Sequence, residues 1–494
     1  MSGLQTSDTN LIKKDVFKFY NDLLGVDPVK DNVLNEYDFK IKSLNMTESE
    51  SDNLNKNITY DEAYKVIKKM KVSAPGSSGL TISFYKKFFE FFGEYFITIL
   101  NGEGELPNVF MDSLVKLIPK NNNSVKNIND LRPISLTNID YRIYKKILAN
   151  RLRVVSASVI GDHQTCSIPN RSINDNINII RDIIFENNLS GSELYLVSVD
   201  ESKAFDRLSP KYLFKLLEHL NFGNFILKSI KKIYNRSCAK IIINNSMCDL
   251  IYIISGLKQG CALSMLLYIL CIEELIIRIK LNDRIKGYFL NMYNKQECKA
   301  AGYADDISGF LQTLESIGLF FNEFEEWGSI SGAILNVNKT KILALNSNYT
   351  VFNNIRFIET LKILGIEFNS RGISENNLEN IIERIEKSVF IWSCVNMSVI
   401  DRIIACKTFI LSKLWYLANF IIVNEKKIKI IDRIVHKYIW NSPIERIKRN
   451  TLILPYDNGG LKSVCIRARL NTILTKNFIY VLPFLRLFSI KSTH

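Results

Sequence analysis

Residues 300–310 read Ala-Ala-Gly-Tyr-Ala-Asp-Asp-Ile-Ser-Gly-Phe, and this stretch predicts two short strands joined at an aspartate pair. Asp305 and Asp306 are adjacent carboxylates in an otherwise apolar segment. Two such charges at about 4 Å repel each other by roughly 4 kcal/mol at an effective dielectric constant near 20. Divalent cations would neutralise them, and metal ions held by aspartates indicate phosphoryl-transfer chemistry.

A third carboxylate, Asp200, ends the run Leu-Tyr-Leu-Val-Ser-Val-Asp at residues 194–200. The run is short, rich in β-branched residues and preceded by Ser190-Gly191, which predicts a strand. Alone, such an aspartate is typical of a turn or cap. Together with the pair at 305 and 306, it could hold two Mg²⁺ ions about 3.5–4 Å apart, which activate an attacking hydroxyl and stabilise a leaving oxygen.

Composition and charge limit the class of protein. With 494 residues, 47% of them hydrophobic, the chain can bury large cores and should divide into two to four lobes. Sixty-four basic against 50 acidic residues give a net charge of +14, which favours a polyanionic partner such as nucleic acid over mere solubility. Nine cysteines without a C-x-x-C pair, and only four scattered histidines, argue for free thiols in a reducing compartment rather than a zinc site.

Targeting and membrane signals are absent from the sequence. No apolar segment follows Met1, and the longest apolar stretches, 261–271 and 409–423, are shorter than the roughly 20 residues that span a bilayer. We therefore expect a soluble intracellular protein in the nucleus and/or cytoplasm, with no membrane partner.

Local patterns predict several further elements. Residues 11–24 form a helical candidate, whereas the polar, acidic stretch 45–57 is expected to be mobile. A capping box at Thr59-x-x-Glu62 begins a helix that ends at the Pro- and Gly-containing loop 73–79, and Ser209-Pro210 begins another helix. Helical patterns dominate residues 376–441. The overall expectation is a mixed α+β core with helical additions on its C-terminal side.

Residues 141–155 read as a basic amphipathic helix. Ile143, Ile147, Leu148 and Leu152 form its apolar stripe, and Lys145, Lys146, Arg151 and Arg153 carry its charge. Two interpretations stay open for these basic side chains, a nucleic-acid contact or a solvated face.

At these motifs the chain resembles reverse transcriptases, particularly those of non-LTR (LINE-type) retrotransposons. The blocks that carry the resemblance appear in family order over about residues 73–369: Ser73-Ala-Pro-Gly-Ser-Ser-Gly79, Leu117-Ile118-Pro119-Lys120, Leu131-Arg132-Pro133-Ile134-Ser135-Leu136, His163-Gln164-Thr165 through Asn170-Arg171-Ser172-Ile173, Asp200-x-x-Lys203-Ala204-Phe205-Asp206, Ser255-Gly256-Leu257-Lys258-Gln259-Gly260 through Leu263-Ser264, Tyr303-Ala304-Asp305-Asp306, Asn336-x-x-Lys339-Thr340 and Leu364-Gly365-Ile366. The four-residue block at 303–306 is only moderately specific, but the whole series in order is highly specific.

The resemblance implies an α+β right-hand polymerase: fingers, a palm with a small antiparallel sheet, a helical thumb and a helical C-terminal extension. The domains would be residues 1–57 as an N-terminal region with a polar linker, 58–369 as fingers and palm (core domain about 101–369), 370–440 as thumb and 441–494 as extension. No upstream endonuclease domain or Cys/His knuckle is recognised, so the chain is expected to be either a piece of a mobile element or a product that relies on DNA nicks made elsewhere.

The resemblance also implies roles for single residues. Asp200, Asp305 and Asp306 would be catalytic metal ligands; Lys120 and Arg132 would contact the incoming triphosphate; Phe205 would stand under the sugar and exclude a 2′-hydroxyl; Gln259 and Gly260 would line the nucleotide and template pocket; and Lys339 would protonate the departing pyrophosphate. Alternatives stay open: Arg132 as a surface arginine, Phe205 as core packing, Lys339 as a solvated lysine and Gly260 as the end of an element.

The implied activity is RNA-directed DNA polymerisation, a nucleotidyl transfer that needs an RNA template, a DNA primer or target, dNTPs and two Mg²⁺ ions, which Mn²⁺ could replace. The chain departs from the family pattern where Ser78 replaces an aspartate, Ala262 and Met265 replace prolines, and Ile363 replaces an aromatic residue. These departures motivate a second hypothesis, a catalytically weak or dead RNA-binding relic. An intron-maturase-like RNA-binding protein is a third.

Overall fold

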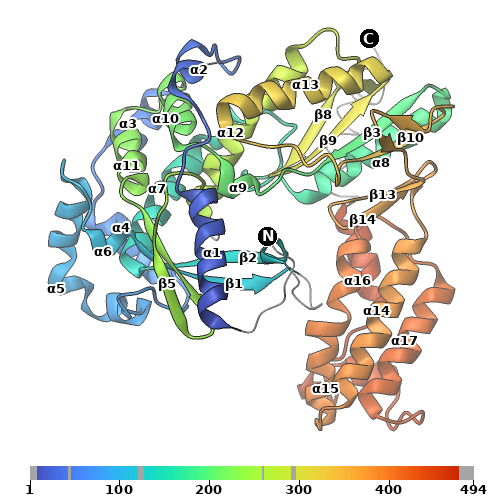
Figure 1. The fold of residues 1–494 in the computed structure, drawn as a ribbon. Coiled ribbons are helices and arrows are strands. Elements are labelled where there is room, and N and C mark those ends of the chain that lie inside the picture. The colour runs from blue at the N-terminus through green and yellow to red at the C-terminus, as the bar shows by residue number, and fades with distance from the viewer. Residues whose placement is uncertain (1–7, 43–45, 121–126, 259–260, 291–295, 478–494) are drawn as a thin grey trace. The chain divides into compact units, whose positions relative to one another are not determined.

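The structure is a computed structural model, and it describes residues 8–42, 46–120, 127–258, 261–290 and 296–477. The chain forms two compact units (Figure 1). The first unit comprises residues 1–176 and 192–357, and the second comprises residues 177–191 and 358–494.

The first unit contains both helices and strands. Its helices are α1 (Thr9–Leu24), α2 (Asp31–Glu36), α3 (Glu48–Asn55), α4 (Tyr60–Lys69), α5 (Ile82–Asn101), α6 (Asn108–Met111), the 3₁₀ turn η1 (Ile128–Asp130), α7 (Ile139–Val159), α9 (Ala204–Arg207), α10 (Pro210–His219), α11 (Asn224–Tyr234), α12 (Ala262–Leu281) and α13 (Leu314–Ser331). Its strands are β1 (Asp112–Pro119), β2 (Leu131–Thr137), β3 (Leu194–Val199), β4 (Cys238–Ile243), β5 (Ser246–Tyr252), β6 (Tyr288–Leu290), β7 (Gln296–Cys298), β8 (Ala300–Tyr303), β9 (Asp306–Leu311), β10 (Lys341–Leu345), β11 (Val351–Phe352) and β12 (Ile355–Arg356).

An antiparallel sheet of order β10-β3-β9-β8 carries the predicted aspartates. Strand β3 is buried along nearly its whole length, which explains its almost uninterrupted apolar sequence. Helix α12 packs against β8 and α13 against β9 (Figure 1). The predicted strand at 194–200 and the predicted hairpin at 300–310 are both confirmed, and the α+β fold class is confirmed with them.

A second sheet, of order β2-β1-β4-β5, mixes a parallel β1–β4 pair with antiparallel neighbours. Helix α1 covers its apolar face, where Val16 and Tyr20 pack with Val115, Ile241 and Ile251. The predicted helix at 11–24 is therefore confirmed.

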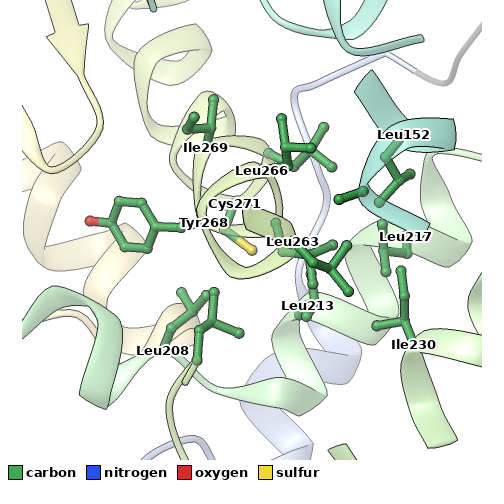
Figure 2. Close-up of a cluster of buried hydrophobic side chains, with 14 of the residues drawn as sticks. Leu152, Leu208, Leu213, Leu217, Ile230, Leu263, Leu266, Tyr268, Ile269 and Cys271 are labelled. Carbon is green, nitrogen blue, oxygen red and sulfur yellow. The ribbon is translucent and has the colours of Figure 1, made fainter. Parts of the chain in front are cut away.

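The main core of the first unit surrounds α12. This helix is apolar on nearly all sides, as expected of a helix enclosed by others. Figure 2 shows its side chains meeting Leu152 of α7, Leu213 and Leu217 of α10 and Ile230 of α11. Ser209 caps α10 by accepting a hydrogen bond from the Tyr212 amide, as predicted. Thr59 caps α4 in the same way through the Glu62 amide, but only this half of the predicted capping box forms, because the Glu62 carboxylate accepts from Arg151 instead.

The expectation of a mobile segment at 45–57 is wrong. Residues 48–55 form α3, and Thr47 and Glu50 close a full capping box at its N-terminus. Leu54 is 0% exposed and belongs to the main core. One buried leucine and good caps stabilise a helix whose composition is otherwise polar.

The expectation of a solvated face is wrong for two of the basic side chains of residues 141–155. In α7, Lys145 is 2% exposed and Arg151 6% exposed. The Arg151 guanidinium donates to both Glu62 carboxylate oxygens, at 2.9 and 2.6 Å, and to the Lys56 carbonyl at 2.6 Å. These partners lie about ninety residues away in sequence, so helical periodicity does not reveal them.

The second unit has a three-stranded sheet and a group of helices. Helix α8 (Ile173–Ser190) begins in the first unit and continues into the second. The sheet is β13 (Thr360–Ile363), β14 (Ile366–Asn369) and β15 (Gly372–Ile373), and the helices are α14 (Asn376–Ser393), α15 (Val399–Ala405), the π-helical turn η3 (Cys406–Ile410), α16 (Ser412–Leu417), α17 (Glu425–Trp440), α18 (Arg449–Ile453) and the 3₁₀ turn η4 (Tyr456–Asn458). The helical prediction for 376–441 is confirmed.

The nine cysteines are free thiols. Within the described residues, every helix is too short or too polar to cross a membrane.

Candidate active site

Asp200 and Asp306 lie opposite each other at the same end of the two central strands of the antiparallel sheet, β3 and β9. Strands β3 and β9 are paired up to Val199 and Ile307. Asp200 and Asp306 are the next residue on each strand, where opposed Cα atoms lie about 4.5–5.5 Å apart. Strand pairing thus brings together two aspartates that are about one hundred residues apart in sequence.

Asp305 occupies the two-residue turn between β8 and β9, because Tyr303 pairs directly with Asp306. Its neighbour Ala304 has φ = 57°, a left-handed conformation that costs a residue with a Cβ roughly 1–2 kcal/mol. Such strain persists only where the surroundings hold it.

Gln164 provides that restraint. Its side-chain Oε1 accepts from the Ala304 amide at 3.0 Å, and its Nε2 donates to the Ala304 carbonyl at 3.3 Å. Gln164 is 0% exposed, and its Oε1 also accepts from the Cys166 amide at 3.1 Å. Gln164 therefore fixes both peptide groups of the residue that precedes Asp305.

Asp200 is held from another direction by the segment after α13. The Asn336 amide donates to the Asp200 carbonyl at 2.8 Å, and the Asn336 side-chain Nδ2 donates to the Asp200 carboxylate at 3.1 Å. The exposed Lys339 ammonium lies 3.3 Å from the same carboxylate oxygen. The Asn-x-x-Lys motif thus positions and partly neutralises the first aspartate.

Burial and mutual repulsion perturb the aspartates. Asp306 is exposed, but partial desolvation by the surrounding protein raises its pKa to about 6, and the negative charges of Asp305 and Asp200 add to the effect. Burial likewise raises the pKa of Asp305; Asp200 adds to this rise, whereas Arg132 opposes it. The three carboxylates and Arg132 therefore share one electrostatic environment, in which a bound cation would be stabilised.

A fourth acid lies behind this group. Glu201 accepts a hydrogen bond from the Tyr268 hydroxyl at 2.8 Å, and its burial raises its pKa to about 8. The Tyr268 ring stacks on Phe205, with centroids 4.5 Å apart. Phe205 is only partly buried, so it packs on the core while keeping one side accessible.

The two residues expected to contact a triphosphate are both exposed. Lys120 follows β1, and Arg132 lies on the neighbouring β2. Lys203, in the loop after β3, has a pKa lowered to about 8 by burial and by the nearby charges of Lys120 and Arg207, against the opposing effect of Asp206. This side of the site is therefore rich in positive charge.

Two other predicted site residues, Gln259 and Gly260, lie outside the described residues. Sequence reasoning assigned no role to Gln164 and Asn336, although both stand inside quoted motifs, and it overlooked the Tyr268–Glu201 contact. For Gln164 and Asn336, their positions inside the motifs could have indicated a role. Tyr268, in the middle of an apolar helix, offers no such signal.

No set of three or more His, Cys, Asp or Glu side chains in the described ranges is arranged closely enough to form a ready metal centre. The chemistry of the donors nevertheless fits a hard divalent cation, because Asp200, Asp305 and Asp306 offer carboxylate oxygens and repel one another without it.

Residues 118–368, just over half of the chain, match the family described as reverse transcriptase (RNA-dependent DNA polymerase). The chain therefore belongs to the reverse transcriptase family, whose members generally depend on divalent metal ions. The resemblance to reverse transcriptases of non-LTR retrotransposons is confirmed by the relatives.

Among these relatives, the Transposon TX1 uncharacterized 149 kDa protein of Xenopus laevis is 28% identical over 95% of this chain and 36% of its own length. The Retrovirus-related Pol polyprotein from type-1 retrotransposable element R2 of Nasonia vitripennis is 23% identical over 66% of this chain and 32% of its own length. The chain spans about a third of the length of these curated relatives. A solved telomerase from Candida albicans, in complex with a TWJ fragment of telomeric RNA, is 13% identical and aligns over 84% of this chain and 69% of its own, with a TM-score of 0.40.

Proposed function

We propose that this chain is an RNA-directed DNA polymerase that extends a primer 3′-OH with dNTPs on an RNA template. The observation that carries the proposal is the placement of Asp200, Asp305 and Asp306 at one edge of the β3–β9 pair, inside the segment that matches the family. A DNA primer or target and an RNA template are the partners of this reaction, which would take place in the nucleus or cytoplasm.

Asp200, Asp305 and Asp306 would hold two Mg²⁺ ions, or Mn²⁺ in their place. When bound, such ions supply activation of the primer hydroxyl and stabilisation of charge on the leaving oxygen. Gln164, through the Ala304 amide, and Asn336, through the Asp200 carboxylate, would keep the metal-binding carboxylates in position.

The remaining groups would act on the nucleotide. Lys120 and Arg132 would bind the triphosphate through charge-assisted hydrogen bonds, and Phe205 would limit the space beneath the sugar. The primer oxygen forms a bond to the α-phosphorus as the bond to pyrophosphate breaks. The primer hydroxyl would give its proton to solvent water, and Lys339 would give a proton to the departing pyrophosphate.

The four-part division into an N-terminal region (1–57), fingers and palm (58–369), thumb (370–440) and extension (441–494) stays a proposal. Its support is the position of the matched segment, 118–368, within the second part. The nucleotide and template contacts of Gln259 and Gly260 also stay predictions.

The test is template-directed dNTP incorporation by the purified chain with and without Mg²⁺, alongside Asp305→Asn. We expect Asp305→Asn to lower the rate by about 10³-fold or more, because several kcal/mol of charge stabilisation are lost. RNA affinity should change by less than about twofold, since a single metal ligand contributes little to strand binding. Asp283→Asn, an exposed aspartate outside the site, is the matched control and should retain the wild-type rate.

If the folded wild-type chain shows no metal-dependent incorporation on several templates, the polymerase proposal is overturned. Salt-sensitive RNA binding that is unaffected by Asp305→Asn would then favour the RNA-binding relic.

A further inference from the structure

A second cationic feature lies apart from the aspartates, in a cavity of about 330 Å³. We call it the basic pocket and define it by four side chains: Arg142, Lys145 and Lys146 of α7, and Lys258. Its volume is at the small end of the range of ligand sites, about 300–1,000 Å³, and is enough for a nucleotide-sized group.

Two of these basic groups are deeply buried. Lys145 is 2% exposed and Lys258 6% exposed. Both ammonium groups lie over the ring of Tyr141, at 4.7 and 5.1 Å from its centroid. The Lys258 ammonium donates to the Met111 carbonyl at 3.0 Å. Burying two like charges around one ring is costly unless an anion joins them or one ammonium group loses its proton.

In the described part of the chain, no carboxylate contacts the basic groups of the basic pocket directly, although the charge of Asp112 acts on Lys258 from beyond ion-pair distance. Among the described residues, none of its four basic side chains has an Asp or Glu partner within 4.0 Å. The thiol of Cys261 also lines the pocket; burial opposes its ionisation, but the Lys145 ammonium and the Ser264 and Leu263 amides lower its pKa. One thiol cannot balance four basic groups.

Another basic cavity of the first unit provides a contrast. Four basic residues line it; Lys211, Lys231 and Arg236 pair with Asp31, Glu218 and Glu105, whereas Lys232 donates to the Gly102 carbonyl. Three of the four charges of that cavity are therefore already neutralised by the chain itself. Those of the basic pocket are not, and this difference marks it as a site for an external anion.

The rim of the basic pocket is fixed before any ligand binds. The Arg142 guanidinium donates to the Ala74 carbonyl at 2.8 Å and to the Ser73 hydroxyl. Beyond the rim, the same loop is held by the Asn138 side chain, which accepts from the Ser78 amide at 3.0 Å; a side chain at Gly76 would clash with Asn138. A rim that is already ordered costs less conformational entropy on binding.

We propose that the basic pocket binds a phosphate group of a bound nucleic-acid strand, with Lys145 and Lys258 as its buried partners and Arg142 at its rim. The inference rests on the proposed function for the identity of the strand as template. It adds to the roles given to Lys120 and Arg132, which would take the triphosphate. A nucleoside triphosphate carries the same phosphate chemistry and is the other source that the experiment must separate.

The experiment compares the full chain with Lys145→Met/Lys258→Met. One arm measures the Kd of a labelled single-stranded RNA by fluorescence anisotropy. The other measures binding of a non-hydrolysable dNTP analogue to the protein–template–primer complex by calorimetry. Lys231→Met, which removes an ion-paired lysine of the largely neutralised cavity, is the matched control.

We expect the double variant to weaken RNA binding about tenfold, as loss of charge-assisted contacts to phosphate requires, with analogue binding unchanged. Lys258→Arg should stay close to wild type, because it keeps the charge. Weaker analogue binding with unchanged RNA binding would support a phosphate site but assign it to the nucleotide. If neither affinity falls in a folded double variant, the inference is overturned.

Lys145 and Lys258 have no ion-pair partner within the ranges that the structure describes, so removal of their buried charges should cost little stability. If the double variant nevertheless unfolds, the single variants Lys145→Met and Arg142→Gln provide the same comparison. Unchanged affinities for RNA and for the dNTP analogue in both variants would then overturn the proposal that the basic pocket binds phosphate. Neither arm needs turnover. A chain without polymerase activity can therefore still show the site, and failure of the pocket is distinguishable from failure of the proposed function.

Discussion

At the scale of single residues, Gln164 fixes the turn that carries Asp305. It makes hydrogen bonds to both peptide groups of Ala304, which is strained at φ = 57°. We predict that Gln164→Met, which keeps the side-chain length, lowers kcat by about 10²-fold, because a shift of about 1 Å in a reacting group can cost that much. The KM for dNTP should change much less, since the hydrogen bonds of Gln164 go to Ala304 and Cys166 and not to the residues proposed to bind the nucleotide. Steady-state kinetics with a template–primer measure the split.

A matched control exists elsewhere in the fold. Asn101 brackets Ile58 in the same manner, accepting from its amide and donating to its carbonyl, both at 2.8 Å. Asn101→Leu should lower the melting temperature as Gln164→Met does, yet leave kcat near wild type. Equal losses of kcat in the two variants would show that Gln164 has only a general structural role.

The titration of Lys258 predicts that the affinity for RNA depends on pH. Burial and the nearby Lys145 ammonium lower its pKa to about 7, against the opposing effects of Cys238, Asp112 and Cys261. A contact with phosphate needs the ammonium form, so its share of RNA affinity should fall by up to about tenfold per pH unit above pH 7. Lys258→Arg stays charged and should lose this dependence. Anisotropy titrations between pH 6.5 and 8.5 measure it.

The contribution of Lys258 to stability should change in the opposite direction. Its folded-state pKa lies below the unfolded value of about 10.4, so the unfolded chain binds more protons between about pH 7 and 10.4 and the free energy of unfolding rises with pH there. RNA affinity and stability that fall together over this range would contradict the assignment.

At the scale of elements, α1 is an integral part of the first unit. Tyr20, 1% exposed, packs on the β2-β1-β4-β5 sheet, and the Phe19 ring lies 3.8 Å beneath the Lys203 ammonium. The Leu24 carbonyl accepts from the Ile254 and Ser255 amides at 2.7 and 2.9 Å. The helix therefore joins the sheet to both the loop after β3 and the segment before α12.

We predict that Tyr20→Ala lowers the free energy of unfolding by about 3–5 kcal/mol, the cost of removing a large buried aromatic side chain. Leu11→Ala, on the exposed side of the same helix, should cost less than about 0.5 kcal/mol. Urea denaturation followed by circular dichroism compares them. Equal and small losses would show that the helix is a dispensable addition.

At the scale of the whole molecule, the net charge of +14 predicts salt-dependent binding to RNA. For single strands, log K falls by about 0.7 per phosphate contact for each unit of log[salt], so about six contacts give a loss of about 10²- to 10³-fold between 50 and 200 mM salt. Anisotropy titrations over this range measure the slope. Asp305→Asn should leave it unchanged, and affinity that is independent of salt would contradict an electrostatic interface.

Much of this protein could be predicted from local sequence. The strand before Asp200, the hairpin at Tyr303–Asp306, the cap at Ser209 and the helices of 376–441 all follow from short periodicities and capping residues. The order of the motifs indicated the reverse transcriptase family. These features depend on neighbours within a few residues along the chain, which is why the sequence alone determines them.

Only the tertiary structure decided which distant groups meet. Gln164 reaches Ala304 across 140 residues, Arg151 reaches Glu62 across 89, and Lys145 lies in the core although its helix reads as basic and amphipathic. Hydrogen bonds and burial at such separations depend on how sheets and helices pack, and no local pattern encodes that packing. The sequence thus determined the elements and the acidic residues, and the packing determined which side chains hold those acids in place.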